Sequence, residues 1–252
     1  MKRLIFAVLI LMFNNASFAQ LTVMMSGGFT NPYKQLLPEF ERTTGISVKT
    51  LSGASQGSGT QTIKAQLEKG VRADVVILSR EGLTELIESG RIAIGTDRDL
   101  GIAPLAAAVP MGSPKPDIST VEKLKVALLK THLISVPGST SGIFLINDVF
   151  PRLGISEKIS VVKSERGSQA VEMLASKKAD LAILPTSELM FAPGIEMIGR
   201  LPAEVQLLQI FAVAAVKDSE QMANASKLIS FLSSKNASAA IISGGMDLIP
   251  GK

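Results

Sequence analysis

Residues 21–30 are Leu21-Thr22-Val23-Met24-Met25-Ser26-Gly27-Gly28-Phe29-Thr30, an apolar run that ends in a turn rich in glycine and hydroxyl groups. The run contains β-branched side chains and has the length of a strand. An amphipathic segment of helical length follows it. Because the same unit recurs along the chain, we predict an α/β fold whose helices connect the strands of a mainly parallel sheet.

The recurring pattern gives the positions of the expected elements. We expect strands at residues 21–25, 46–51, 74–78, 105–109, 133–136, 159–162 and 181–184. We expect helices at residues 32–43, 62–69, 81–89, 121–130, 142–153 and 168–176, and a shorter one near Ser187. Pro38 should bend the first helix, because proline has no amide hydrogen to donate.

Two segments interrupt this alternation. Residues 103–116 contain an apolar strand that ends in a Gly- and Pro-rich stretch, and residues 205–216 form a long run that precedes helices at 219–233 and 235–243. A chain that leaves one lobe and later completes it would cross at two such strands. We therefore predict one lobe from residues 20–102 plus 213–252 and a second from residues 103–212; a single doubly wound sheet is the alternative.

Residues 1–19 have the pattern of an export signal. Lys2 and Arg3 precede the apolar stretch Leu4–Phe13, and Ser17-Phe18-Ala19 is a small-x-small cleavage pattern. A membrane anchor is the alternative, but the stretch is too short for a bilayer, which needs about 20 residues. We expect cleavage after Ala19 and a periplasmic mature protein.

Composition excludes several classes of function. The chain has no cysteine, one histidine and a net charge of +4, and its carboxylates are not clustered. We therefore expect no metal and no other cofactor. The absence of basic stripes makes nucleic acid an unexpected partner. His132 precedes a strand, at the end of the sheet where ligands do not bind, so we expect no catalytic role for it.

Three turns point to a binding site for an anion. In parallel α/β sheets, ligands bind beyond the carboxyl ends of the strands. The turns Ser26–Thr30, Ser52–Thr60 and Pro137–Gly142 follow three expected strands and offer hydroxyls and backbone amides at helix starts. Helix capping is the alternative for each turn alone, but three together favour a site. The candidate ligand-binding residues are Ser26, Gly27, Ser55, Ser58, Thr140 and Ser141. The second turn lacks the Gly-Lys-Ser/Thr ending of a nucleotide-binding loop.

Two arginines follow strands in the same way. Arg80 follows residues 74–79, and Arg166 follows residues 159–165. A guanidinium binds a carboxylate through two parallel hydrogen bonds, so an organic acid would suit this site. The alternative is surface ion pairs, of Arg80 with Glu81 or Glu85 and of Arg166 with Glu165.

Four stretches together form a recognisable pattern: the opening strand with Ser26, Gln66-Leu67-Glu68-Lys69-Gly70-Val71-Arg72-Ala73-Asp74-Val75-Val76, Ser141-Gly142-Ile143-Phe144, and Leu181-Ala182-Ile183-Leu184 with Ser187. Through these stretches the chain resembles, over essentially its whole mature length, the type II periplasmic solute-binding proteins, above all the molybdate-binding proteins of ABC importers. The resemblance implies a two-lobed periplasmic-binding-protein fold that closes on an oxyanion.

The resemblance also implies binding residues and a partner. The matching positions are Ser26, Ser55 or Ser58, Ser141, and the backbone near Arg166 and Gly167. The protein would act as a monomer that delivers a small anionic ligand to an inner-membrane ABC permease.

Departures from the family pattern shift the expected ligand. Pro185 stands where the molybdate binders carry a ligand tyrosine, and Gly27 and Gly28 replace an Ala-Ser type of turn. Together with Arg80, these changes favour a carboxylate or another anion. The resemblance extends to a branch that contains a periplasmic aconitate isomerase. Isomerisation needs a base near a carbon-bound proton, and the candidates, equally readable as solvated loop charges, are Glu81, Glu165, Glu188 and Lys163. We predict a solute-binding protein, with the isomerase as the alternative.

Overall fold

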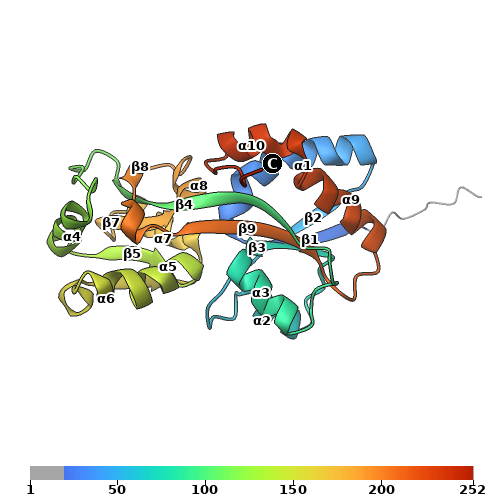
Figure 1. Cartoon of the computed structure of the whole chain (residues 1–252), viewed down its shortest axis with the longest axis horizontal. Coiled ribbons are helices and arrows are strands. Elements are labelled where there is room, and N and C mark those ends of the chain that lie inside the picture. The colour runs from blue at the N-terminus through green and yellow to red at the C-terminus, as the bar shows by residue number, and fades with distance from the viewer. Residues whose placement is uncertain (1–19, 252) are drawn as a thin grey trace, which may run out of the picture.

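The computed structural model describes residues 20–251. The export signal expected at residues 1–19 therefore lies outside the described residues. Figure 1 shows an elongated molecule in which two groups of helices and strands are joined by two long strands lying side by side. These strands are β4, Arg98–Pro110, and β9, Leu208–Ala215.

Strand pairing is continuous from one end of the molecule to the other. The remaining strands are β1 (Leu21–Met25), β2 (Val48–Ser52), β3 (Val75–Ser79), β5 (Ile134–Pro137), β6 (Val161–Ser164), β7 (Leu181–Pro185) and β8 (Ile195–Arg200). Their order is β2-β1-β3-β9-β4-β7-β5-β6, and β8 pairs with β4 outside this path. β2, β1 and β3 are parallel, as are β6, β5 and β7, whereas β4 and β9 run antiparallel to their neighbours.

The first lobe covers both faces of the parallel strands β1–β3 with helices. The helices are α1 (Thr30–Thr44), α2 (Ile63–Glu68), α3 (Arg80–Glu88), α9 (Met222–Leu232) and α10 (Ser238–Ser243). Successive side chains of a strand point to opposite faces. Val23 accordingly packs in the same cluster as Phe40 of α1, whereas Met24 packs with Ile63 of α2 and Leu83 of α3.

The second lobe repeats this arrangement around β5–β7. Its helices are α4 (Val121–Lys130), α5 (Thr140–Phe144), α6 (Phe150–Arg152), α7 (Gly167–Ala175) and α8 (Thr186–Leu189). A π-helical turn, Leu145–Val149, joins α5 to α6. Ile183 packs with Leu124 of α4 on one face, and Leu184 packs with Leu174 of α7 on the other.

Hydrophobic packing divides the molecule where strand pairing does not. The two clusters of the first lobe include β4 as far as Ala103 and begin again at Phe211 of β9. The two clusters of the second lobe begin at Leu105 and end at Val205. β4 therefore belongs to both cores, whereas the buried apolar residues of β9 belong to the core of the first lobe. The residue boundaries 20–102, 103–212 and 213–252 stay a prediction.

The expected elements are present, with differences that have physical causes. Six of the seven expected strands lie within two residues of their expected positions, whereas β4 begins at Arg98 instead of Leu105. Helix α1 runs through Pro38. β8 was not predicted from the sequence, because it is an edge strand with mostly half-exposed side chains and a glycine, Gly199, at φ +148°. None of the helices in residues 20–251 combines the length and apolar character needed to cross a membrane.

Candidate functional site

A cavity of about 150 Å³ lies between the two lobes, at the carboxyl ends of β1, β2, β5 and β6. Its lining comes from both sides of the molecule: Met25, Ser26, Gly27, Thr30, Ser52, Gly53, Ala54, Ser55, Ser139, Ser141, Arg166, Gly167, Ser168, Glu188, Gln209 and Phe211. Of the residues predicted to bind a ligand, the structure brings together Ser26, Gly27, Ser55, Ser141, Arg166 and Gly167 here.

The first lobe contributes two buried serines. The Ser26 backbone amide donates to Ile77 O at 2.9 Å, which fixes the turn after β1, while the Ser26 Oγ is buried without a hydrogen-bond partner. Ser55 Oγ accepts a hydrogen bond from Ser79 N at 2.9 Å and still has its own proton to donate. A buried polar atom without a partner costs free energy, about 1–3 kcal/mol. Ser26 therefore offers a hydroxyl to whatever occupies the cavity.

The second lobe contributes a serine and a positive charge at helix starts. Ser141 lies in the first turn of α5 and is 1% exposed. Arg166 precedes α7, and its Nε is buried without a hydrogen-bond partner. Among residues 20–251, no acidic side chain forms an ion pair with Arg166. The expected alternative of a pair with Glu165 is therefore absent, and the charge of Arg166 remains available to an anion.

Glu188 of α8 has a seat built from glycines of both lobes. A methyl group on Gly27 would lie 2.6 Å from Oε2 of Glu188, and one on Gly167 would overlap the same carboxyl group. Burial raises the pKa of Glu188 to about 7, because the carboxylate loses its solvation. Arg166 is the other charged residue among the lining residues. The cavity thus holds one cation and one carboxyl group that changes its protonation near neutral pH.

Gln209 is a lining residue that the sequence analysis missed. It lies on β9 and is 3% exposed, and its Oε1 has no hydrogen-bond partner. The available signal was a single amide side chain inside the apolar run of residues 207–216. Because that run was interpreted as a core strand, its polar member was not considered.

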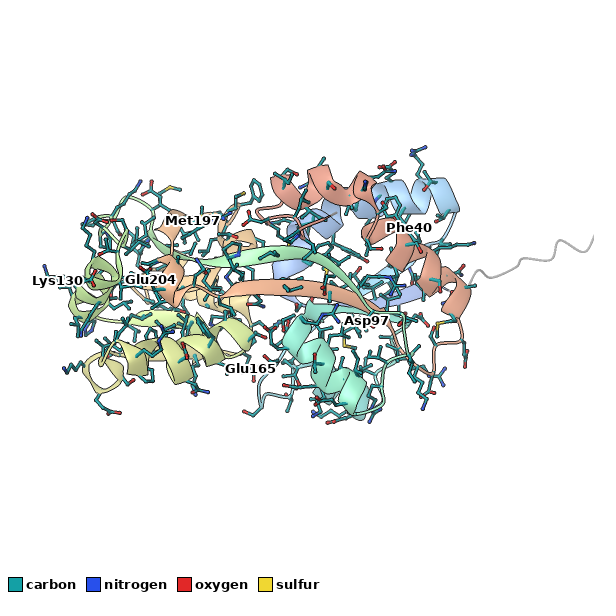
Figure 2. All side chains as sticks on the ribbon, viewed as in Figure 1. Phe40, Asp97, Lys130, Glu165, Met197 and Glu204 are labelled. Atoms are coloured by element: carbon teal, nitrogen blue, oxygen red, sulfur yellow. The ribbon has the colours of Figure 1, made fainter. Side chains whose placement is uncertain are left out.

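Three predicted residues lie elsewhere. Ser58 lines a neighbouring opening of about 240 Å³ together with Lys163 and Glu165; Figure 2 labels Glu165 where the lobes meet. Thr140 does not line the cavity; its Oγ1 lies 2.8 Å from Ser79 Oγ and 2.8 Å from Gln56 Oε1, so it bonds one lobe to the other.

Arg80 also lies outside the cavity lining. Its Nη1 donates to Asp97 at 2.7 Å, and its Nε donates to Asp99 at 2.8 Å. The guanidinium of Arg80 therefore already donates its hydrogen bonds to carboxylates of the same chain. These partners are neither Glu81 nor Glu85, which the sequence analysis offered as the alternative.

The candidate bases separate in the same way. Glu81 is exposed and lines none of the openings described here, and Lys163 and Glu165 face the neighbouring opening. Glu188 is the one of the four that lines the cavity. His132 is exposed and lies beside Lys130 and Asp180, at the amino end of β5.

Contacts between the lobes hold the cavity closed. Besides the hydrogen bonds of Thr140, Asn31 Nδ2 donates to Ser187 O at 2.7 Å, and Thr186 Oγ1 donates to Gly245 O at 2.7 Å. Each of these bonds joins an element of the first lobe to α5 or α8 of the second. Opening the cavity would break them.

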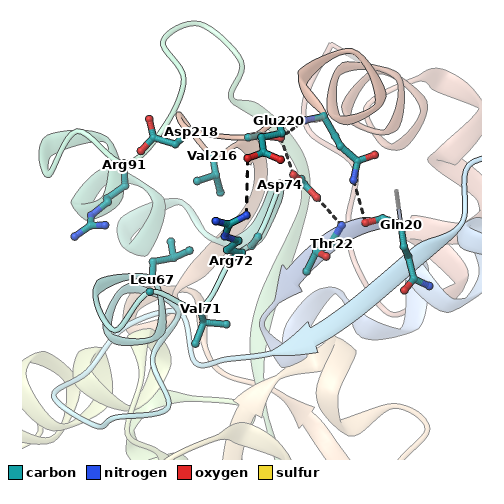
Figure 3. A pocket seen from close by; sticks show the side chains of 14 residues that line it. Gln20, Thr22, Leu67, Val71, Arg72, Asp74, Arg91, Val216, Asp218 and Glu220 are labelled. Carbon is teal, nitrogen blue, oxygen red and sulfur yellow. Dashed lines mark hydrogen bonds and ion pairs between the residues drawn. The ribbon is translucent and has the colours of Figure 1, made fainter. Parts of the chain in front are cut away.

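A larger concavity of about 640 Å³ lies on the first lobe, at the amino ends of β1 and β3 (Figure 3). Its charged side chains either have partners or are exposed to solvent. Arg91 and Asp218 belong to the exposed ones. Asp74 accepts from Thr22 N and from Ser219 Oγ, each at 2.7 Å, and Arg72 lies 3.8 Å from Glu220. The Arg72 and Glu220 side chains are 92% and 85% exposed. This surface therefore lacks the buried, unpartnered groups of the cavity between the lobes. Within residues 20–251, no group of three or more histidine, aspartate and glutamate residues is placed to hold a metal ion.

Comparison with known proteins agrees with this architecture. Residues 21–247 match the model of the family described as bacterial extracellular solute-binding protein. The chain is 32% identical over 231 residues to an aconitate isomerase from a Pseudomonas species, which covers 91% of this chain and 88% of that protein.

Solved structures share the fold at lower identity. The periplasmic molybdate-binding protein of Azotobacter vinelandii has a TM-score of 0.71 at 22% identity, covering 91% of this chain and 100% of that one. The sulfate-binding protein of Mycobacterium tuberculosis has a TM-score of 0.74 at 17% identity, covering 92% and 88%. The predicted two-lobed fold of the type II periplasmic binding proteins is confirmed.

Proposed function

The chain belongs to the bacterial extracellular solute-binding proteins, and we propose that its cavity binds a small organic carboxylate between two closing lobes. The observation that carries this proposal is the pair of buried, unpartnered donors, Ser26 Oγ and Arg166 Nε, that line one cavity from opposite lobes. Both groups would gain the hydrogen bonds they lack when an anion binds.

Arg166 and Glu188 together favour a carboxylate over a molybdate-like oxyanion. A planar guanidinium matches the two oxygens of a carboxylate. Glu188 in its neutral form can donate a hydrogen bond to a second carboxylate of the same ligand, whereas in its charged form it repels a small dianion. A ligand with several carboxylates and an apolar middle suits this set of groups.

Family membership supports a role in transport. We propose that residues 1–19 direct export, with cleavage after Ala19, and that the mature protein works in the periplasm as a monomer. Closure around the ligand would produce the form that docks on an inner-membrane ABC permease, because contacts between the lobes form only in the closed state. We expect no nucleic acid among its partners.

The direct test is a thermal-shift screen of residues 20–252 against citrate, cis-aconitate, trans-aconitate, molybdate, tungstate, sulfate and phosphate. Selective binding to the folded state raises the melting temperature by mass action. We expect a shift with the polycarboxylates that Arg166→Ala abolishes. A shift with molybdate or tungstate alone would replace the carboxylate by an oxyanion, and the absence of any shift would contradict the proposed site.

A second candidate function is the isomerisation of aconitate. Two observations favour it: the relative that is 32% identical, and a carboxyl group, Glu188, inside the cavity with a pKa of about 7. Incubation with trans-aconitate, followed by NMR detection of cis-aconitate, distinguishes turnover from binding. A binding protein would leave the isomer unchanged at any enzyme concentration.

A further inference from the structure

Glu188 occupies a position that packing alone does not explain. Its carboxyl group reaches the boundary between the lobes, where Gly27 and Gly167 leave room for it. Within the described residues, no group forms a hydrogen bond or an ion pair with this carboxyl. Glu188 is half-buried, and a carboxyl group that loses solvation without gaining a partner is costly. Its oxygens are therefore free to contact a ligand in the cavity.

The surroundings of Glu188 suit proton transfer. Of the residues that line the cavity, Arg166 and Glu188 carry ionisable side chains, and the others are serines, glycines, Thr30, Gln209 and apolar residues. An acid–base group works best when its pKa is near the operating pH, because both protonation states are then populated. Glu188 meets this condition, since its pKa is about 7.

We propose that Glu188 is the catalytic residue that moves a proton between two carbons of an unsaturated polycarboxylate, an assignment that rests on the carboxylate site proposed above. The substrate class is an acid with a methylene group between a carboxylate and a carbon–carbon double bond. A hydrogen on such a methylene is acidified by both neighbours.

The reaction balances without a co-reactant. The Glu188 carboxylate takes a proton from the methylene carbon, and the electron pair of that C–H bond forms a new double bond to the adjacent carbon. The electron pair of the old double bond moves to the third carbon, which takes the proton back from Glu188. The double bond has moved by one position, no atom is oxidised or reduced, and Glu188 returns to its carboxylate form.

The donors around Glu188 match the charge that develops during this step. Removal of the proton spreads negative charge onto the substrate carboxylate oxygens. Arg166 and the Ser26 hydroxyl line the same cavity and lack partners of their own. Donors placed in advance where charge develops lower the barrier, because they need no reorganisation.

The test compares Glu188→Gln with the matched control Glu165→Gln, a glutamate of the neighbouring opening. Each protein is incubated with trans-aconitate in D₂O, and proton NMR follows deuterium entry at carbon and the appearance of cis-aconitate. Thermal shift with the same acid measures binding. We expect Glu188→Gln to keep the shift and to form cis-aconitate about 10²- to 10⁴-fold more slowly, with Glu165→Gln unchanged.

The outcomes separate the two proposals. A wild-type protein that binds the acid but neither forms cis-aconitate nor exchanges a carbon-bound proton overturns the role of Glu188 and leaves the binding function intact. Equal rates of cis-aconitate formation by wild type and Glu188→Gln also overturn it. If no polycarboxylate shifts the wild type, the binding function itself fails. Should Glu188→Gln lack a native circular dichroism spectrum, the wild-type pH profile decides: the rate must rise with one apparent pKa near 7, and a flat profile contradicts the proposal.

Discussion

Arg166 and Glu188 line the same cavity with opposite formal charges, and yet their side chains form no ion pair. An ion pair between them would neutralise the site before a ligand arrives. Their separation instead leaves a cation available to an anion and keeps the carboxyl group at a pKa of about 7. The two arginines that follow strands, Arg80 and Arg166, consequently have different expected roles.

Arg166→Ala should weaken binding of a polycarboxylate by about 10- to 100-fold, since a hydrogen bond to a charged group contributes about 1.5–3 kcal/mol. The melting temperature without ligand should change little, because Arg166 has no ion-pair partner among residues 20–251. Arg80→Ala is the matched control with the opposite expectation: it removes the guanidinium that pairs with Asp97 and Asp99, so stability falls and affinity stays. Isothermal titration with thermal unfolding measures both, and an affinity loss confined to Arg80→Ala would reverse the assignment.

Ser26→Ala should lower affinity about tenfold, because the hydroxyl lost is one that a ligand satisfies. The ligand-free protein should be as stable as wild type or slightly more stable, since the buried Ser26 Oγ has no partner. Ser79→Ala is the control: Ser79 Oγ accepts from Gly82 N at the start of α3, and its loss should cost about 1 kcal/mol of stability. Urea unfolding measures the stability of the two variants. An equal loss of stability in Ser26→Ala and Ser79→Ala would contradict the unpaired state of the Ser26 hydroxyl.

Glu188 should make stability depend on pH in a defined direction. Its pKa is raised from 4.5 to about 7, so the folded state binds this proton more tightly than the unfolded state does. The free energy of unfolding therefore falls as pH rises from 4.5 to 7. Relative to wild type, Glu188→Gln should gain roughly 1.4 kcal/mol per pH unit across that range. Urea unfolding without ligand at pH 4.5, 6 and 8 measures this. The exposed Glu165→Gln should show no such gain, and parallel pH profiles for wild type and Glu188→Gln would refute the expectation.

Gly27→Ala and Gly167→Ala should displace the Glu188 carboxyl without unfolding the protein. The added methyl group meets the end of a flexible side chain at both positions, so the side chain can move. We expect ligand affinity and any proton exchange to fall at least tenfold, with melting temperatures near wild type. Gly59→Ala is the control, since a methyl group at that position would lie 3.6 Å from Oε1 of Glu165, which is an ordinary contact distance. If Gly167→Ala exchanges the proton at the wild-type rate, the space that the two glycines leave for the Glu188 carboxyl group is not needed.

Thr140→Val should weaken ligand binding through closure. The variant loses the hydrogen bonds of Thr140 to Ser79 and Gln56, which join the lobes. Each such bond contributes about 0.5–1.5 kcal/mol, so we expect about a tenfold faster dissociation. Thr131→Val removes a hydroxyl that bonds Ala127 O within the second lobe and should leave dissociation unchanged. Stopped-flow kinetics compares the two, and equal rates would place closure elsewhere.

The sequence predicted the part of the site that depends on strand direction. Ser26, Ser55 and Ser141 meet because the carboxyl ends of parallel strands share one edge of a sheet, and the alternation of strands with helices in the sequence predicts parallel strands. Arg166 follows the same rule. The position of each of these residues along its own strand is sufficient to place it near the cavity.

The rest depended on contacts between distant segments. Arg80 satisfied the strand rule too, but Asp97 and Asp99 lie beside it in the folded chain, and no local pattern predicts that pairing. In the sequence, Glu188 was one of four candidate bases. Its place beside Gly27 of the other lobe distinguishes it from the other three, and that contact exists only in the folded chain. Gln209 was not predicted as a site residue, because its neighbours in the sequence are apolar and indicated a strand of the hydrophobic core.

The pairing of β4 with β9 limits how the cavity can open. The two strands pair from Arg98 with Val213 to Pro104 with Leu208, so they bend together as a single two-stranded ribbon. Independent sliding of the lobes would break backbone hydrogen bonds, whereas a change of curvature keeps them. Gln209 pairs with Ala103 on this ribbon and also lines the cavity. A ligand that binds Gln209 therefore acts directly on the curvature, and the affinity of the site includes the elastic energy of the backbone.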